Sequence, residues 1–160
     1  MKKTLKIIAG ILLLGLIMIQ LFRPDRTNPV SDPGLAINNH LPVPPQVLAI
    51  LERSCFDCHS NQTHWPWYSN IAPASWLVAK DVANGRKHLN FSEWGTYNQK
   101  RRASKLEDIS DEVDRGDMPD SKYLLIHRDA LLSAADKEAL LSWAGQAADS
   151  LKALGGEPAR

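Results

Sequence analysis

Cys55-Phe56-Asp57-Cys58-His59 is the stretch that decides what kind of domain this chain forms. Two cysteines three positions apart, on a turn that opens a helix, present two thiols that can reach the two vinyl groups of one porphyrin. The histidine that follows then directs its imidazole at the iron, and a neutral imidazole is a standard haem ligand. The motif therefore predicts one haem c, attached covalently through Cys55 and Cys58, with His59 as its proximal ligand.

Other uses of a cysteine pair fit the surrounding sequence less well. A thioredoxin-like redox pair needs a βαβ context, which the pattern of the chain lacks. A zinc site needs two further ligands; His64 is near, but the chain has only two cysteines. A disulfide is compatible with the cysteine count, although it would close a tight and strained loop.

Met118 is the candidate for the sixth ligand of the iron. The chain has three methionines, and the other two lie in its first 18 residues. Met118 stands in Gly116-Asp117-Met118-Pro119, where the proline stiffens the loop that presents the sulfur. A thioether opposite a histidine raises the reduction potential of a haem, which suits electron transfer. The alternatives are a Met118 that only packs in its loop and a bis-histidine haem that uses His88 or His127.

Aromatic residues are expected to wall the haem pocket, because a haem needs apolar surroundings and aromatic rings bury large areas. The 160 residues include five tryptophans, and an ordinary core would also use them. The residues expected at the wall follow the motif closely: Trp65, Trp67, Tyr68 and Trp76. Arg86 is a further candidate, as the partner of a haem propionate.

Helical signals dominate the rest of the chain, and no stretch alternates like a strand. Residues 46–53 and 73–84 are expected to be helices, the second ended by Gly85. Residues 107–115 predict a helix closed by Gly116, and residues 61–72 and 116–132 are expected loops. Ser133 and Asp136 resemble a capping box for a final helix. Its buried stripe is expected to be Leu140, Leu141, Trp143, Ala144 and Ala147.

The expected fold is all-α. A helix before the motif and a long final helix with an inward tryptophan resemble the crossing terminal helices of class I cytochromes c. The haem domain is expected over residues 46–155, behind a proline-rich linker at residues 23–45.

The first 22 residues predict a membrane anchor. Ile7 to Phe22 is a run of 16 residues without charge, preceded by three lysines. A cleaved signal is the alternative, but no A-x-A site follows the run, which is short for a span. The lysines predict a single pass through a bacterial inner membrane with the domain on the periplasmic side.

The charge of the chain argues against nucleic acid as a partner. The formal net charge is +1, and from Arg23 onward 16 basic residues face 18 acidic ones. A basic face large enough to bind a phosphate backbone does not follow from that balance.

Several blocks of sequence together resemble the bacterial haem-binding domain family over about residues 40–145. They are Cys55 to Asn61, Trp65 to Ser69, Ile71 to Pro73, Ser75 to Leu77, Asp81-Val82, Gly85-Arg86, Leu89 to Trp94, Gly116 to Pro119 and Tyr123. The resemblance implies a cytochrome-c-like haem domain behind one N-terminal anchor. It also implies that Cys55, Cys58 and His59 hold the haem and that Met118 is at the distal position. Members often have a second proline after Met-Pro, where this chain has Asp120.

An electron carrier is the function that these features favour, with another redox protein of the cell envelope as its partner. The alternatives are a haem-based sensor or peroxidase-like protein with a labile sixth position, and a structural haem subunit of a membrane complex. The sequence shows no evident acid–base pair beside the haem, so an enzyme is not expected. The oligomeric state stays open.

Overall fold

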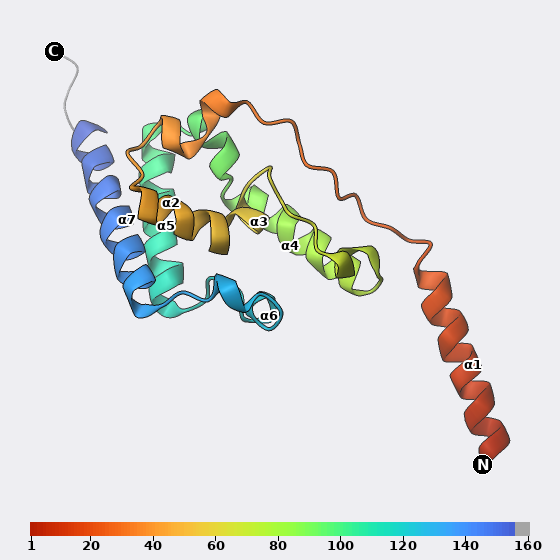
Figure 1. Ribbon diagram of the computed structural model, residues 1–160. Helices are drawn as coiled ribbons and strands as arrows, with labels where there is room; N and C mark the ends of the chain where they lie inside the picture. The colour runs from red at the N-terminus through yellow and green to blue at the C-terminus, as the bar shows by residue number, and fades with distance from the viewer. Residues whose placement is uncertain (156–160) are drawn as a thin grey trace.

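The computed structural model describes residues 1–155, and over that range the protein consists of helices and loops (Figure 1). Because no strand is found among the described residues, the expectation of an all-α fold is confirmed. The α-helices are α1 (Lys2–Ile19), α2 (Pro45–Ser54), α3 (Phe56–His59), α4 (Ala74–His88), α5 (Gln99–Arg115), α6 (Ser121–Leu124) and α7 (Ala134–Gly155). The 3-10 turns are η1 (Pro33–Leu35), η2 (Ile37–Asn39), η3 (Trp67–Asn70), η4 (Phe91–Thr96) and η5 (Arg128–Ala130).

The core lies where α7 packs along α5 and is crossed by α2 (Figure 1). Three residues of the predicted α7 stripe, Leu140, Trp143 and Ala144, are buried there, while Leu141 and Ala147 are partly buried against the same cluster. The α2–α7 contact is the one expected of terminal helices. However, α7 has its most extensive contact with α5.

Local capping signals define two helix ends as predicted. At the start of α7, the Asp136 N–H donates to Ser133 Oγ (3.1 Å) and the Ser133 N–H donates to Asp136 Oδ2 (3.0 Å). This reciprocal pair is the expected capping box. At the end of α5, Gly116 adopts a left-handed conformation with φ of 77°, which favours glycine. The start of α5 is earlier than predicted, because the Asn98 side chain caps the helix by accepting from the Arg101 N–H.

Gly85 does not end α4, so this prediction was wrong: the helix continues to His88. The glycine instead allows α4 to lie against α3. A Cβ added at position 85 would lie 2.9 Å from the carbonyl carbon of Cys58 and closer still to its oxygen. Only a residue without a side chain permits this approach of the two backbones.

The proline-rich segment over residues 23–45 differs from the free linker that its composition predicts. It lies along the domain, and Ile37 and Leu41 are buried in the core, with 1% and 8% of their surfaces exposed. His40 Nε2 lies 3.0 Å from the Gly34 carbonyl oxygen, which closes this part of the segment on itself. The packed domain therefore begins well before residue 46.

Helix α1 projects away from the body of the domain (Figure 1), and none of its residues is buried. Among residues 1–155, no helix has both the length and the apolar character needed to cross a membrane. The membrane span expected over residues 1–22 thus has no support from the structure.

Candidate haem-binding site

The cysteine motif forms a single helical turn at the end of α2. The Cys55 N–H donates to the Leu51 carbonyl (2.9 Å), which extends α2 to the first cysteine. The Cys55 carbonyl in turn accepts from the N–H groups of Cys58 (3.2 Å) and His59 (2.9 Å). Both cysteines are free thiols and do not form a disulfide. The turn predicted to present two thiols and one imidazole is present.

The two thiols are kept protonated by their surroundings. Burial, with a smaller effect of Cys58, raises the pKa of the Cys55 thiol to about 12. Burial, followed by the charges of Asp57 and other nearby carboxylates, raises the pKa of Cys58 to about 11. Both thiols are therefore protonated at neutral pH. No group of three or more potential metal ligands occurs among residues 1–155.

His59 is held in the form that a haem iron requires. Its Nδ1 lies 3.1 Å from the carbonyl oxygen of Leu89, the residue that follows α4. Because a carbonyl only accepts, Nδ1 carries the hydrogen and the lone pair is on Nε2. Burial lowers the pKa of His59, although the bond to Leu89 opposes that effect. The imidazole is therefore neutral and oriented, with Nε2 free to bind iron. The donor set of this chain fits a haem.

A row of aromatic side chains that the sequence did not predict lies beside the motif. Phe56 stacks on Phe91 with ring centroids 5.2 Å apart, and the edge of the His59 ring faces Phe91 at 6.4 Å. Trp94 and Tyr97 continue this row, and Trp94 is fully buried. Phe56, Phe91 and Trp94 stand in the sequence blocks that carry the family resemblance. However, η4 has no α-helical periodicity that would indicate the burial of its aromatic side chains.

The four residues expected at the wall are all at least partly exposed. Trp67 is 73% exposed and Trp76 is 39% exposed, so both are at the surface. Trp65 is partly buried, and its Nε1 donates to Asn28 Oδ1 (3.2 Å). Tyr68 is also partly buried and is paired with a histidine, as described below. The contact of these four residues with a haem remains a prediction.

A buried polar network fixes η4 to the loop after His59. The Asn61 N–H donates to Ser92 Oγ (3.0 Å), and Asn90 Nδ2 donates to Asn61 Oδ1 (2.8 Å). The Asn90 N–H donates to the Tyr97 hydroxyl (2.9 Å). Since buried polar groups are costly without partners, these bonds specify one position for Phe91 and Leu89 relative to His59.

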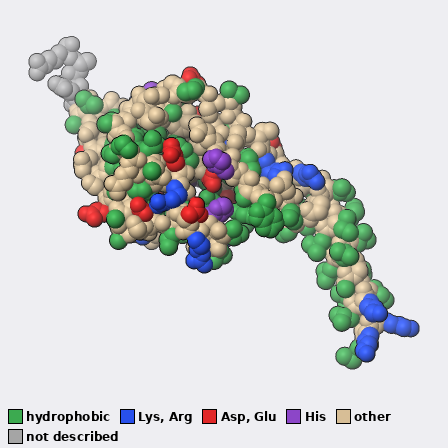
Figure 2. All heavy atoms as spheres, viewed as in Figure 1, with side chains coloured by type: hydrophobic (Ala, Val, Ile, Leu, Met, Phe, Trp, Pro, Cys, Tyr) green, Lys and Arg blue, Asp and Glu red, His purple; other side chains and the backbone are tan. Residues whose placement is uncertain are grey.

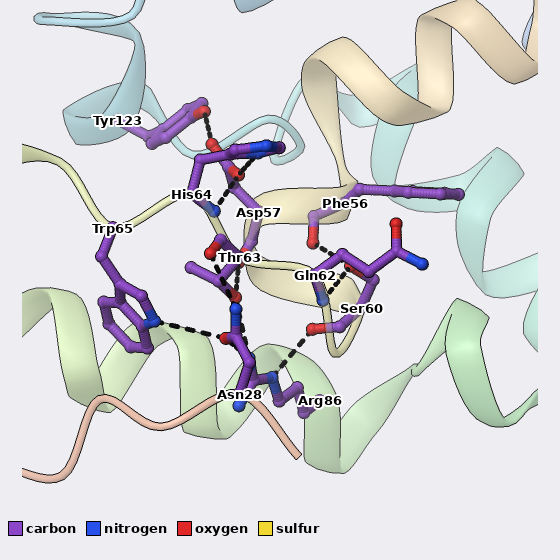
Figure 3. Close-up of polar contacts among 10 residues, drawn as sticks. All are labelled: Asn28, Phe56, Asp57, Ser60, Gln62, Thr63, His64, Trp65, Arg86 and Tyr123. Atoms are coloured by element: carbon purple, nitrogen blue, oxygen red, sulfur yellow. Dashed lines mark hydrogen bonds and ion pairs between the residues drawn. The ribbon is translucent and has the colours of Figure 1, made fainter. Parts of the chain in front are cut away.

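Arg86 fixes the same loop from the other side (Figure 3). Its Nε donates to the Ser60 carbonyl (2.8 Å), and its Nη2 donates to Thr63 Oγ1 (2.9 Å) and Asn28 Oδ1 (2.7 Å). Asn28 Nδ2 donates in turn to the Thr63 carbonyl (3.0 Å). The predicted pairing of Arg86 with a propionate remains a prediction. In the structure its guanidinium has protein acceptors instead.

Asp57, between the two cysteines, connects α3 to α6 (Figure 3). Its Oδ2 accepts from the Tyr123 hydroxyl (2.9 Å), and its Oδ1 accepts from the His64 N–H (2.9 Å). The Tyr123 ring stacks on His127 at 4.1 Å, and His127 Nε2 lies 2.7 Å from the Tyr68 hydroxyl. This cluster of titratable side chains beside the motif was not foreseen, because its members are spread over 71 positions of sequence.

The Met118 loop lies on the cysteine side of the domain. Asp120, two residues after Met118, is close enough to contribute to the raised pKa of the Cys58 thiol. The Met118 side chain is 38% exposed, and its N–H donates to the Glu112 carbonyl (3.2 Å) at the end of α5. His88 is exposed at the end of α4, whereas His127 is paired with Tyr68. Coordination of iron by Met118 remains a prediction.

Comparison with known proteins agrees with this geometry. A family model described as a haem-binding domain matches residues 14–146, which is most of the chain and includes the motif, Arg86 and Met118. No curated protein and no solved structure matches the chain. The match confirms the resemblance seen in the sequence, and the chain belongs to the haem-binding domain family.

Proposed function

We propose that the protein is a monohaem c-type cytochrome that transfers electrons between redox partners. The single observation that carries the proposal is the His59 Nδ1 contact with the Leu89 carbonyl at 3.1 Å, beside two free thiols on one turn. This contact gives the histidine the tautomer of an iron ligand. The family shows haem binding, and the CxxCH turn supports covalent attachment of that haem.

Each residue of the site has a separate task. Cys55 and Cys58 would hold the haem through two thioethers, and His59 Nε2 would bind its iron. Met118, from the loop that follows α5, would supply a further ligand. When bound, the haem would supply a one-electron iron couple, and unchanged ligands in both oxidation states would keep reorganisation of the site small.

The proposal includes a place at a membrane. We infer that α1 attaches the protein to a bacterial inner membrane, with the domain on the periplasmic side. In support, α1 exposes apolar side chains along its whole length, and its three lysines lie in the first six residues. The partner would be another redox protein of the envelope, met through a small and weak interface.

Covalent attachment is tested by extraction with acidified acetone. Haem should stay with the wild-type protein and leave the protein with Cys55→Ser and Cys58→Ser. A matched control is Ser54→Ala with Ser60→Ala, which changes two neighbours of the motif but neither thiol. If the solvent removes haem from the wild-type protein, attachment through these cysteines is wrong.

The distal ligand is tested by absorption spectroscopy of the ferric protein. The wild type should show the weak far-red band of methionine–iron charge transfer, and Met118→Ala should lack it. Leu125→Ala is a suitable control, because Leu125 is an exposed apolar residue of the same loop region. A high-spin spectrum of the wild type, or an unchanged spectrum of Met118→Ala, would refute the assignment.

One observation favours a second function, that of a haem protein with an open sixth position. The Tyr68 hydroxyl and His127 Nε2 lie 2.7 Å apart next to the motif, which is the geometry of a pair that can exchange a proton. A high-spin ferric spectrum together with peroxidase turnover that His127→Phe abolishes would favour this function over electron transfer.

A further inference from the structure

Exposed apolar side chains gather where α1 joins the domain. Figure 2 shows hydrophobic side chains covering this junction. Between 39% and 73% of each side chain is exposed to solvent, and we call the set the junction patch: Leu21, Phe22, Trp67, Ile71, Trp76 and Leu77. Single exposed apolar residues are ordinary, but a contiguous group marks an interaction surface.

Hydrogen bonds fix the end of α1 against η3 and the first turn of α4, so the patch has a defined shape. The Gln20 side chain pairs with the Ala72 backbone twice, donating from Nε2 (3.0 Å) and accepting at Oε1 (2.9 Å). Trp76 Nε1 donates to the Phe22 carbonyl (2.7 Å), and Arg26 Nη1 donates to Asn70 Oδ1 (2.6 Å). The C-terminal end of α1 is therefore held against the domain by hydrogen bonds.

The patch continues directly into an apolar helix, and this continuity indicates its occupant. Helix α1 has apolar side chains exposed on all its sides, from Leu5 to Met18. A protein partner covers one face of a helix, whereas lipid surrounds all of them. The patch also contains two tryptophans, which are enriched at the boundary between lipid and water. Trp76 Nε1 already donates to the Phe22 carbonyl, so burial of the ring in an apolar environment would leave no donor without a partner.

Basic residues stand next to the patch in the sequence. Arg23 and Arg26 follow Phe22, with Asp25 between them, and Lys80 follows Leu77 in α4. Basic residues next to an apolar surface add attraction to anionic headgroups.

We propose that the junction patch docks on the surface of a bilayer that contains anionic lipid, beside the helix α1 that attaches the chain to the membrane. The inference rests on the proposed attachment through α1, and it adds that the domain lies on the membrane in one orientation. Trp67 and Trp76 enter the interface together with Leu21 and Phe22. The motif turn and its haem are then held at a fixed height and angle to the membrane.

Hydroxyl-radical footprinting of the full haem-loaded protein tests this orientation. The protein is compared in detergent and in vesicles of phosphatidylcholine with phosphatidylglycerol, and oxidation is read residue by residue by mass spectrometry. Oxidation of Trp67 and Trp76 should fall in vesicles relative to Leu125 and Leu131, which are exposed elsewhere on the domain. Pure phosphatidylcholine vesicles should give weaker protection. Flotation of the vesicles reports attachment through α1 separately.

A variant distinguishes docking from simple attachment. Trp67→Ser with Trp76→Ser should still float with the vesicles but lose the protection at Ile71 and Leu77. Leu125→Ser with Leu131→Ser, a change of equal polarity away from the patch, should keep it. If the wild type floats while Trp67 and Trp76 stay as reactive as in detergent, docking is wrong and attachment survives. If the chain does not float, both are wrong. Protection without lipid, in a particle of twice the mass, would show a second copy as the occupant and overturn the proposal.

Discussion

Gly85→Ala probes the contact between α4 and the cysteine motif. An added methyl group would lie 2.9 Å from the Cys58 carbonyl carbon, 3.1 Å from Cys58 Cβ and closer still to the Cys58 oxygen. Both helices would meet through backbone atoms, so no rotation of a side chain can relieve the overlap. Helix α4 has to move away from α3, and the bonds of Arg86 to the Ser60 carbonyl and to Thr63 lie next to the point of movement.

The expected loss of stability follows from two opposing effects. Overpacking against a fixed backbone costs about 3 kcal/mol. The replacement of glycine by alanine inside a helix returns about 1 kcal/mol. Gly85→Ala should therefore lower the free energy of unfolding by about 2 kcal/mol, which is a large part of the stability of a small domain.

Gly145→Ala is the matched control. Gly145 is also inside a helix, α7, but a Cβ there would meet nothing within 4 Å. This variant should gain up to about 1 kcal/mol, because only the helix propensity changes. Urea unfolding followed by circular dichroism measures both values. If Gly85→Ala is as stable as the wild type or as Gly145→Ala, the close packing of α4 on the motif turn is not a determinant of this fold.

Three further outcomes are expected. In the chain without haem, the thiol pKa values of Cys55 and Cys58 are raised by folding, so just above pH 9 only the unfolded state loses these protons. The free energy of unfolding should therefore be unaffected below about pH 9 and decline between pH 9 and pH 12. Urea titrations should show a smaller decline for the variant with Cys55→Ser and Cys58→Ser, and an equal decline would contradict the assignment of these pKa values. Ser133→Ala should cost about 1 kcal/mol in urea unfolding by removing the α7 cap, with the exposed Ser150→Ala nearly neutral. Asn28→Ala removes the side chain that accepts hydrogen bonds from Arg86 and Trp65 and donates one to the Thr63 carbonyl. Proteolysis of residues 23–41, followed by mass spectrometry over time, should therefore be faster in this variant. Equal cleavage rates would show that Asn28 does not hold this segment.

Local signals in the sequence were sufficient where one side chain satisfies the backbone beside it. Ser133 with Asp136 and the left-handed Gly116 lie within a few residues of the helix end that they define. The motif turn is local in the same sense, since Cys55 to His59 is one hydrogen-bonded turn. These features need no knowledge of the distant chain.

Long-range contacts account for the predictions that differ from the structure. The local sequence predicts that Gly85 ends a helix. In the structure this position has no room for a Cβ because the backbone of Cys58, 27 positions earlier, packs against it. The burial of Phe91 depends on η4, which the bond between Asn61 and Asn90 places next to the motif. Ile37 ends a run of only three apolar residues, Leu35 to Ile37, which is too short to show the periodic pattern of a buried helix.

The segment that carries Asn28 also has a consequence for the order of assembly. Residues 23–41 leave the ribosome before their partners, and Thr63 and Arg86 follow Asn28 by 35 and 58 positions. Contacts between such distant positions form late in folding, because the loop between them has to close. Until then the loop after His59 lacks the bonds of Asn28 to Thr63 and Arg86. We therefore expect the proposed thioether attachment at Cys55 and Cys58 to take place before the N-terminal segment closes on this loop.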